Sequence, residues 1–243
     1  MAKAAAWSSR SLIGAGFVSV LVIGFLGLGI WQLERREWKL ALIARVEARI
    51  QAAPVAVPDL ATEKPSDVAR SEYTRVIATG HFLNDRETLV EAVTIHGGGA
   101  WVLTPFVTDS GLTVLVNRGF VPFDKKPTDT RIAGQLAGTV VVTGLLRPSE
   151  PKGGFLRSND PAADRWYSRD VAAIADKRGL SGEIEPYFID ADATPNPGGF
   201  PIGGLTVINF PNNHLVYALT WFAMGIGLAG ATIWLAVRSR REG

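Results

Sequence analysis

The chain has 243 residues, of which 47% are hydrophobic and 20% are charged, and its formal net charge is +2. This balance is typical of a soluble domain averaged with membrane helices, and the absence of a long basic or acidic block argues against a nucleic-acid partner. The chain contains no cysteine. Disulfides and Cys-x-x-Cys redox or copper-delivery chemistry are therefore excluded.

The first apolar segment, residues 11–33, contains no charged residue and is long enough to cross the hydrocarbon core as a helix. We expect it to remain in the mature protein, because a cleavable signal has a shorter apolar core followed by a small-residue cleavage site. Residues 1–10 form a tail too short for a typical organelle transit peptide. A bacterial inner (plasma) membrane is therefore the expected location.

The second span, residues 212–237, decides the expected orientation. It is followed at once by a basic tail, residues 238–243, and the twenty residues before it contain no Lys or Arg. The positive-inside rule then predicts a cytoplasmic C-terminus. With two spans, both termini are expected in the cytoplasm, and the intervening domain in the periplasm.

Residues 34–71 are expected to form a stalk and linker. Apolar residues recur at helical spacing between Trp38 and Ala53, which predicts that the first helix continues outward as an amphipathic stalk. Pro54 and Pro58 are expected to end that helix, and residues 52–71 to form an extended linker.

Residues 72–211 are expected to form a β-rich periplasmic domain. β-Branched enrichment and partial alternation predict strands over residues 73–80, 87–93, 100–107, 112–116, 139–146, 186–190 and 206–210. One helix is expected after Ser168-Arg169-Asp170, with a glycine at its C-terminal end. The predicted fold is a membrane protein with two transmembrane helices flanking a mostly antiparallel β (α+β) domain, a curved sheet or partial barrel with one covering helix.

No catalytic constellation is present in the sequence. It contains no Gly-x-Ser-x-Gly elbow, phosphate loop, His-Glu-x-x-His helix or dinucleotide fingerprint, so we do not expect an enzyme. The run His96-Gly97-Gly98-Gly99 favours a flexible hairpin loop. His81 and His96 lack a carboxylate or thiolate partner for a metal site, which favours surface or hydrogen-bonded histidines.

Two further residues leave alternatives open. Arg118 follows a hydrophobic strand and could hold a carboxylate or propionate, or could form a structural ion pair at the strand end. Trp166 lies in a polar and aromatic stretch that could be a docking surface or a loop closing over the core.

His214 stands at the start of the second apolar span, the only imidazole in a long uncharged segment. Helical spacing places Tyr217 and Trp221 on its face as aromatic walls, with Ala218 and Gly225 as a small-residue floor. Such a slot could receive haem, whose iron takes a neutral imidazole as axial ligand. The alternative is an interfacial histidine that caps the helix beside an ordinary Tyr/Trp belt.

Small residues in both apolar segments predict a paired helical hairpin, because they allow close backbone approach. In the first segment they are Gly24, Gly27 and Gly29, and in the second Gly225, Gly227, Gly230 and Ala231.

Several blocks together resemble a bacterial member of the Surfeit locus family of cytochrome c oxidase assembly factors. The blocks are residues 29–39, 73–76, 80–82, 115–122, 159–161 with Trp166 and Asp170, and 212–222. The resemblance extends in order from residue 28 to 236. Phe120 stands where the family is expected to carry tryptophan, which is a mild departure.

The resemblance implies a non-enzymatic factor in cytochrome c oxidase biogenesis that assists haem a insertion into the catalytic subunit of a haem–copper oxidase by transient haem a binding. It implies that His214 ligates the haem iron, with Tyr217 and Trp221 beside it. Trp31 and Gln32 match another family block and would have a docking or structural role. Expected partners are that subunit, a haem a synthase, the lipid bilayer and a second copy of the chain. The alternative is a cofactor-free membrane scaffold that stabilises an immature oxidase subunit.

Overall fold

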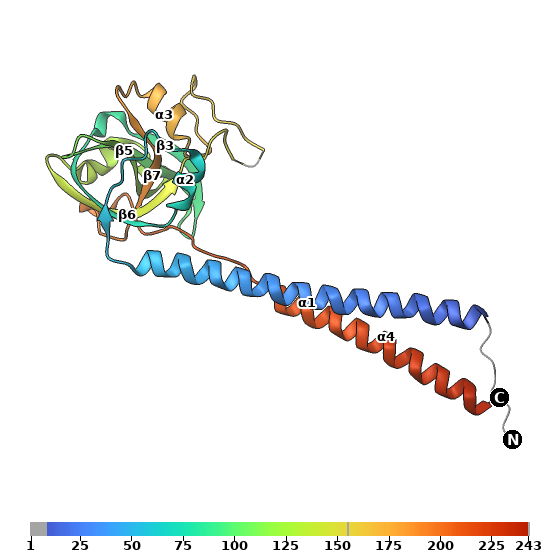
Figure 1. Ribbon diagram of the computed structural model, residues 1–243. Coiled ribbons are helices and arrows are strands. Elements are labelled where there is room, and N and C mark those ends of the chain that lie inside the picture. The colour runs from blue at the N-terminus through green and yellow to red at the C-terminus, as the bar shows by residue number, and fades with distance from the viewer. Residues whose placement is uncertain (1–8, 155, 243) are drawn as a thin grey trace. The chain divides into compact units, whose positions relative to one another are not determined.

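The structure is a computed structural model that describes residues 9–154 and 156–242. The chain divides into two compact units, Met1–Arg45 with Asn209–Gly243, and Val46–Ile208. The first unit contains most of helix α1 (Ser9–Gln51) and all of α4 (His214–Glu242), which lie side by side (Figure 1). The second unit contains the β domain.

Helices α1 and α4 are both long and apolar enough to cross a membrane. Only 6% of the most apolar window of each helix is buried within the protein, so their apolar side chains face outward, as lipid contact requires. Ile13 and Ile226, for example, are 73% and 67% exposed. Helix α1 continues without a break from the apolar segment to Gln51, because its outer part keeps a helical pattern and has no proline before Pro54.

Seven strands in the described residues form one sheet in the order β1-β2-β6-β7-β5-β4-β3. Their bounds are β1 (Val55–Ala56), β2 (Arg75–Phe82), β3 (Thr88–Thr94), β4 (Gly97–Thr108), β5 (Thr113–Pro122), β6 (Val140–Pro148) and β7 (Ile184–Ala191). A further antiparallel pairing between β2 and β4 closes the sheet into a small barrel. All pairings are antiparallel except β1 with β2 and β5 with β7.

Gly80 is the point at which β2 passes from one neighbour to the other. It pairs with Val140 of β6 and with Thr108 of β4. A Cβ at this position would lie 2.1 Å from the Val107 carbonyl oxygen, so only glycine allows the two backbones to approach closely enough to close the barrel.

Three apolar clusters hold the β domain together, the smallest of them around Val102. The largest fills the barrel with residues such as Val76, Phe106 and Ile189. The second packs Trp166 and Ile174 against Leu115 and Phe188, beneath α3 (Val171–Lys177). Asp170 caps α3 by accepting a hydrogen bond from the Ala173 N–H at 3.2 Å. The two apolar helices, the mainly antiparallel barrel and this covering helix confirm the predicted fold class.

Short helices complete the β domain. They are α2 (Pro65–Arg70), η1 (Asn84–Arg86), η2 (Phe123–Lys125), η3 (Thr128–Gly134) and η4 (Pro197–Gly199). The predicted extended linker therefore contains β1 and α2, because tertiary contacts order it: the Leu60 N–H donates to Glu185 Oε2 at 2.8 Å, and the Tyr187 hydroxyl donates to the Pro58 carbonyl at 2.5 Å.

The structure corrects two predicted segments. Residues 206–210 do not form a strand; β7 already pairs with β5 and β6, and Thr206 is instead tied to β7 by its hydroxyl, which donates to Asp190 Oδ2 at 3.1 Å. Gly97, Gly98 and Gly99 begin β4 rather than forming a flexible loop, since the Phe123 and Phe120 rings occupy the space that side chains at Gly98 and Gly99 would need.

Candidate functional site

His214 is the first residue of α4, and its ring contacts α1. Its Nδ1 lies 2.7 Å from Oε1 of Gln32. Because a carbonyl oxygen only accepts hydrogen bonds, Nδ1 must carry the proton and donate it. In the neutral imidazole the lone pair then belongs to Nε2, the atom that remains available to a metal. Gln32 thus favours the tautomer of His214 in which Nδ1 carries the proton.

Small and aromatic residues pack α4 against α1 below this hydrogen bond. The rings of Phe25 and Trp221 stack with centroids 5.7 Å apart and an interplanar angle of 26°. A Cβ on Gly29 would lie 2.4 Å from the Phe222 ring, and Ala218 is fully buried. The two helices run antiparallel, as the predicted hairpin requires, and small residues set their close approach.

The helical face of His214 is not an open slot. Ala218 and Gly225, expected as its floor, are buried, and a Cβ on Gly225 would meet Phe25 and Leu26 of α1. Trp221 is partly covered by Phe25. Tyr217 is 56% exposed. The structure therefore brings His214 and Gln32 together, packs Trp221 against Phe25 further along the helix pair, and leaves Tyr217 exposed.

Aromatic and basic residues lie near this site, on α1 around Gln32 and in the segment just before α4. Trp31 is 51% exposed beside Gln32 in the chain. The Arg35 guanidinium lies 4.7 Å from the Trp38 ring centroid, and the Lys39 amine lies 5.4 Å from that of Phe210. Such pairs are typical of residues at a membrane–water boundary.

Arg118 lies within β5 rather than beyond a strand end, because β5 continues to Pro122. The residue is 2% exposed, and its guanidinium donates to the Gly134 carbonyl and stacks 4.5 Å from the Phe82 ring centroid. Burial lowers its pKa from 12.5 to about 10. Among the described residues no carboxylate forms the ion pair that was one of the two alternatives for Arg118.

Trp166 is 1% exposed and belongs to the core under α3. Its indole N–H donates to Asp164 Oδ1 at 2.7 Å. The side chain therefore packs the interior and is not available as a docking surface. His96 stacks on Phe120 with ring centroids 6.2 Å apart. Within the described residues, no group of three His, Cys, Asp or Glu side chains is placed to hold a metal ion.

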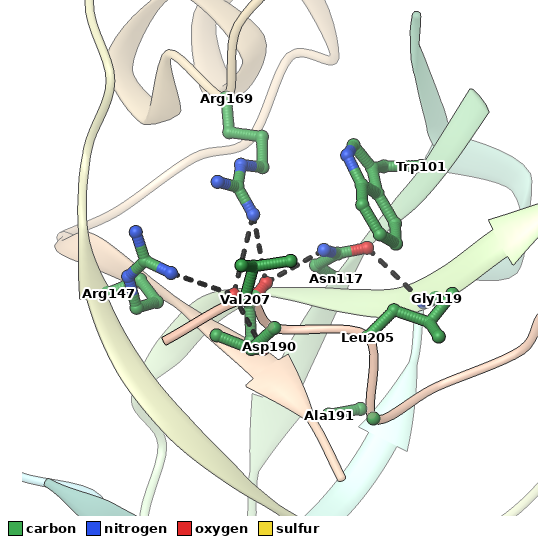
Figure 2. Close-up of a pocket in the computed structure, with 11 residues that line it drawn as sticks. Trp101, Asn117, Gly119, Arg147, Arg169, Asp190, Ala191, Leu205 and Val207 are labelled. Carbon is green, nitrogen blue, oxygen red and sulfur yellow. Dashed lines mark hydrogen bonds and ion pairs between the residues drawn. The ribbon is translucent and has the colours of Figure 1, made fainter. Parts of the chain in front are cut away.

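Sequence reasoning missed a buried ionic cluster around Asp190, which lies beside a cavity of about 200 Å³. Figure 2 shows the Asp190 carboxylate between Arg147, Arg169 and Asn117. Asn117 Nδ2 donates to it at 2.7 Å, and the nearest Arg169 and Arg147 nitrogens lie at 3.1 and 3.4 Å. Because the carboxylate faces two guanidinium groups, its charge is compensated inside the protein. The feature of the sequence that could have indicated this cluster was Asp190, an acidic residue at the end of the predicted strand over residues 186–190.

The chain is similar to known proteins over most of its length. A family model described as the SURF1 family matches residues 19–226. A SURF1-like protein of Monosiga brevicollis is 39% identical over 261 aligned residues, which cover 100% of this chain and 95% of the relative. Surfeit locus protein 1 of Rattus norvegicus is 39% identical, with 87% of this chain and 71% of the relative covered. The protein of the same name from Homo sapiens is 40% identical, with 86% and 71% covered.

Proposed function

The chain belongs to the SURF1 family, and from that premise we propose that it is a cytochrome c oxidase assembly factor that holds haem a during insertion into the oxidase catalytic subunit. The family is known for oxidase assembly and is generally non-catalytic. The absence of catalytic motifs in the sequence agrees with a role as a carrier or chaperone.

One observation carries the haem part of this proposal: the 2.7 Å hydrogen bond between His214 Nδ1 and Gln32 Oε1. Histidines that ligate metals almost always donate their other ring N–H to an acceptor, which fixes the ring and raises its basicity. A histidine that only capped the helix start would not need a partner on α1. Gln32 thus gives the family block at residues 29–39 a physical role beside His214.

The residues around His214 fit haem a as a cargo. The Nε2 lone pair would supply one axial ligand to the iron, and exposed Tyr217 would offer an aromatic surface to the macrocycle. Because Ala218 and Gly225 pack against α1, the haem would lie on the outer side of the helix pair and not between the helices. Trp221, stacked on Phe25, would support the helix pair from within.

The proposed setting is a bacterial inner membrane, with both termini in the cytoplasm and the β domain in the periplasm. Arg238, Arg240 and Arg241 after the second span support this orientation. The proposed partners are the catalytic subunit of the oxidase, a haem a synthase and a second copy of the chain, which could supply the other axial ligand.

The test is to co-express the chain with a haem a synthase and to record the absorption spectrum of the detergent-purified protein. We expect haem a bands in the wild type, their loss in His214→Ala, and no change in His96→Ala, a matched control on the β domain. Unchanged bands in His214→Ala would exclude the ligand role. A colourless wild type that still co-purifies with oxidase subunits would support the cofactor-free scaffold instead.

A further inference from the structure

Arg118 is a buried cation that forms no ion pair among the described residues, and Glu87 attracts it only from a distance. The other deeply placed guanidinium groups of the β domain have carboxylate partners: Arg131 pairs with Glu87, and Arg169 pairs with Asp190 and Glu150. Arg118 makes no such pair in the described part of the chain. Burying an unpaired charge is costly, so proteins normally pair buried charges with an opposite charge.

The hydrogen bonds of Arg118 leave part of the guanidinium unused. Its Nη2 donates to the Gly134 carbonyl and, at 3.3 Å, to Asn196 Oδ1, and its Nη1 donates to Asn84 Oδ1 at 3.4 Å. All three acceptors are neutral oxygens. Since a guanidinium has five N–H groups, two of them have no acceptor among the described residues.

A cavity of about 100 Å³ opens beside this guanidinium. Its apolar walls come from Phe82, Val116, Leu136, Val140 and Val142. Asp192 also lines the cavity, but its Oδ1 accepts hydrogen bonds from the Thr194 backbone N–H and hydroxyl at 3.0 and 2.6 Å, and it forms no ion pair with Arg118. Glu87 attracts the guanidinium from a distance but forms no ion pair with it. The cavity thus combines a positive charge that has no ion pair with a largely apolar surface.

The size of the cavity limits what could enter. Its volume of about 100 Å³ suits a ligand of a few non-hydrogen atoms. A carboxylate can accept one of the remaining N–H groups and offset the charge, while a short aliphatic body covers the apolar wall. A phosphate has no apolar part to match that wall.

We propose that the Arg118 cavity is a binding site for a short aliphatic carboxylate about the size of propionate. The site belongs to the β domain, and the proposal does not depend on haem binding by the helical unit. Burial of the ligand carboxylate beside Arg118 would stabilise the folded β domain, because only the folded state contains the cavity.

The test measures thermal unfolding of the full-length, detergent-purified protein in increasing sodium propionate, with sodium chloride holding the ionic strength constant. We expect a saturable rise of about 2–4 °C in the unfolding midpoint of the wild type. Arg118→Gln should abolish the rise. Arg165→Gln, which removes a cation that is 65% exposed, should retain it.

A second variant covers the case in which Arg118→Gln does not fold. Val140→Phe keeps the arginine and fills the cavity from a partly buried wall position, so it should also abolish the rise. Equilibrium dialysis of labelled propionate against the wild type should give one site per chain. Any of three results would overturn the carboxylate assignment. They are a midpoint in propionate no higher than in chloride, a rise in either cavity variant equal to that of the wild type, and an equal rise with inorganic phosphate.

Discussion

At the level of single side chains, the contact between His214 and Gln32 joins residues 182 positions apart. Each residue alone has an ordinary explanation, since polar residues are common at the ends of membrane helices. Together they form an oriented imidazole with one nitrogen satisfied and the other available. The proposal of a ligand site at His214 therefore rests on this contact and not on the histidine alone.

Replacing Gln32 should weaken haem a binding without removing the ligand. In Gln32→Leu the Nδ1–H loses its acceptor, and loss of such a partner typically lowers metal affinity about 10–100-fold. Gln32→Glu keeps an oxygen acceptor and should retain binding. Titration of the purified variants with haem a, followed by absorption, measures the effect. Equal affinities for Gln32→Leu and wild type would contradict the positioning role.

Asp190 should be among the most sensitive residues of the β domain. In Asp190→Asn two buried guanidinium groups lose part of their compensating charge, which should cost about 3 kcal/mol in the free energy of unfolding. Denaturant unfolding of the purified protein measures this loss. The control is Asp160→Asn, whose partner Arg165 is 65% exposed and whose change should have little effect. A similar small effect for both variants would show that the cluster is not a stabilising centre.

At the level of elements, the close approach of α1 and α4 depends on which glycines face the partner helix. A Cβ on Gly29 would collide with the Phe222 ring, whereas one on Gly27 would meet nothing within 4 Å. Both glycines were expected to contribute to the helix pair. Only the rotation of each helix about its axis decides which of them does.

A disulfide can test this helix pairing, since the chain has no cysteine of its own. A Cβ on Gly225 would lie 3.4 Å from the Phe25 Cβ, close to the separation that a disulfide requires. Phe25→Cys with Gly225→Cys should therefore cross-link under mild oxidation. Phe25→Cys with Gly227→Cys, which faces away, should not. After cleavage at a protease site introduced at Gly182, gel mobility shows whether the two halves of the chain remain joined by the disulfide. Equal cross-linking yields for the two double-cysteine variants would refute the pairing.

The ion pair between Glu87, which directly precedes β3, and Arg131 of η3 should weaken in acid. Burial alone would raise the pKa of Glu87, but hydrogen bonding and attraction from Arg131 outweigh it and lower that pKa below its ordinary value of 4.5. A carboxyl group with a lowered pKa stabilises the folded state above its unfolded pKa, and this stabilisation is lost as the pH falls through the folded value. Glu87→Gln should therefore destabilise the protein at pH 7, and its difference from wild type should shrink below pH 4.5. Unfolding across this range, with exposed Glu63→Gln as control, measures the change; a constant difference would contradict it.

For the whole molecule, the two apolar helices are suited to lipid and the β domain is suited to water. The helices leave their apolar side chains exposed, whereas the β domain buries its own in three clusters. This contrast follows from the hydrophobic effect, because apolar side chains avoid water but are at no disadvantage against lipid tails.

Reporter fusions should establish the orientation of the chain. Because basic residues follow the second span, alkaline phosphatase fused after Gly243 should be inactive and green fluorescent protein at the same point should be fluorescent. Alkaline phosphatase inserted at Gly182, in the β domain, should be active. The reverse pattern would place the β domain in the cytoplasm and contradict the proposed setting.

Much of the fold could be predicted from local patterns. The predicted helix after Asp170 matches α3, and the predicted strand at 139–146 lies within β6 apart from its first residue. The predicted strand over residues 206–210 was wrong. Alternation of side chains shows only that a segment is able to form a strand, whereas strand pairing also needs an open sheet edge. The predicted flexible loop at residues 97–99 was wrong because glycine is also found in strands where aromatic rings lie against the backbone.

The sequence by itself determined the two apolar spans, the β-rich domain between them and the identity of His214 as the residue to examine, because hydropathy and periodicity are properties of neighbouring residues. Only the tertiary structure decided that Gln32 contacts His214, that Ala218 and Gly225 face α1, and that Arg118 is buried without an ion pair among the described residues. The reason is that hydrogen bonds, burial and charge compensation depend on which distant residues the fold brings together.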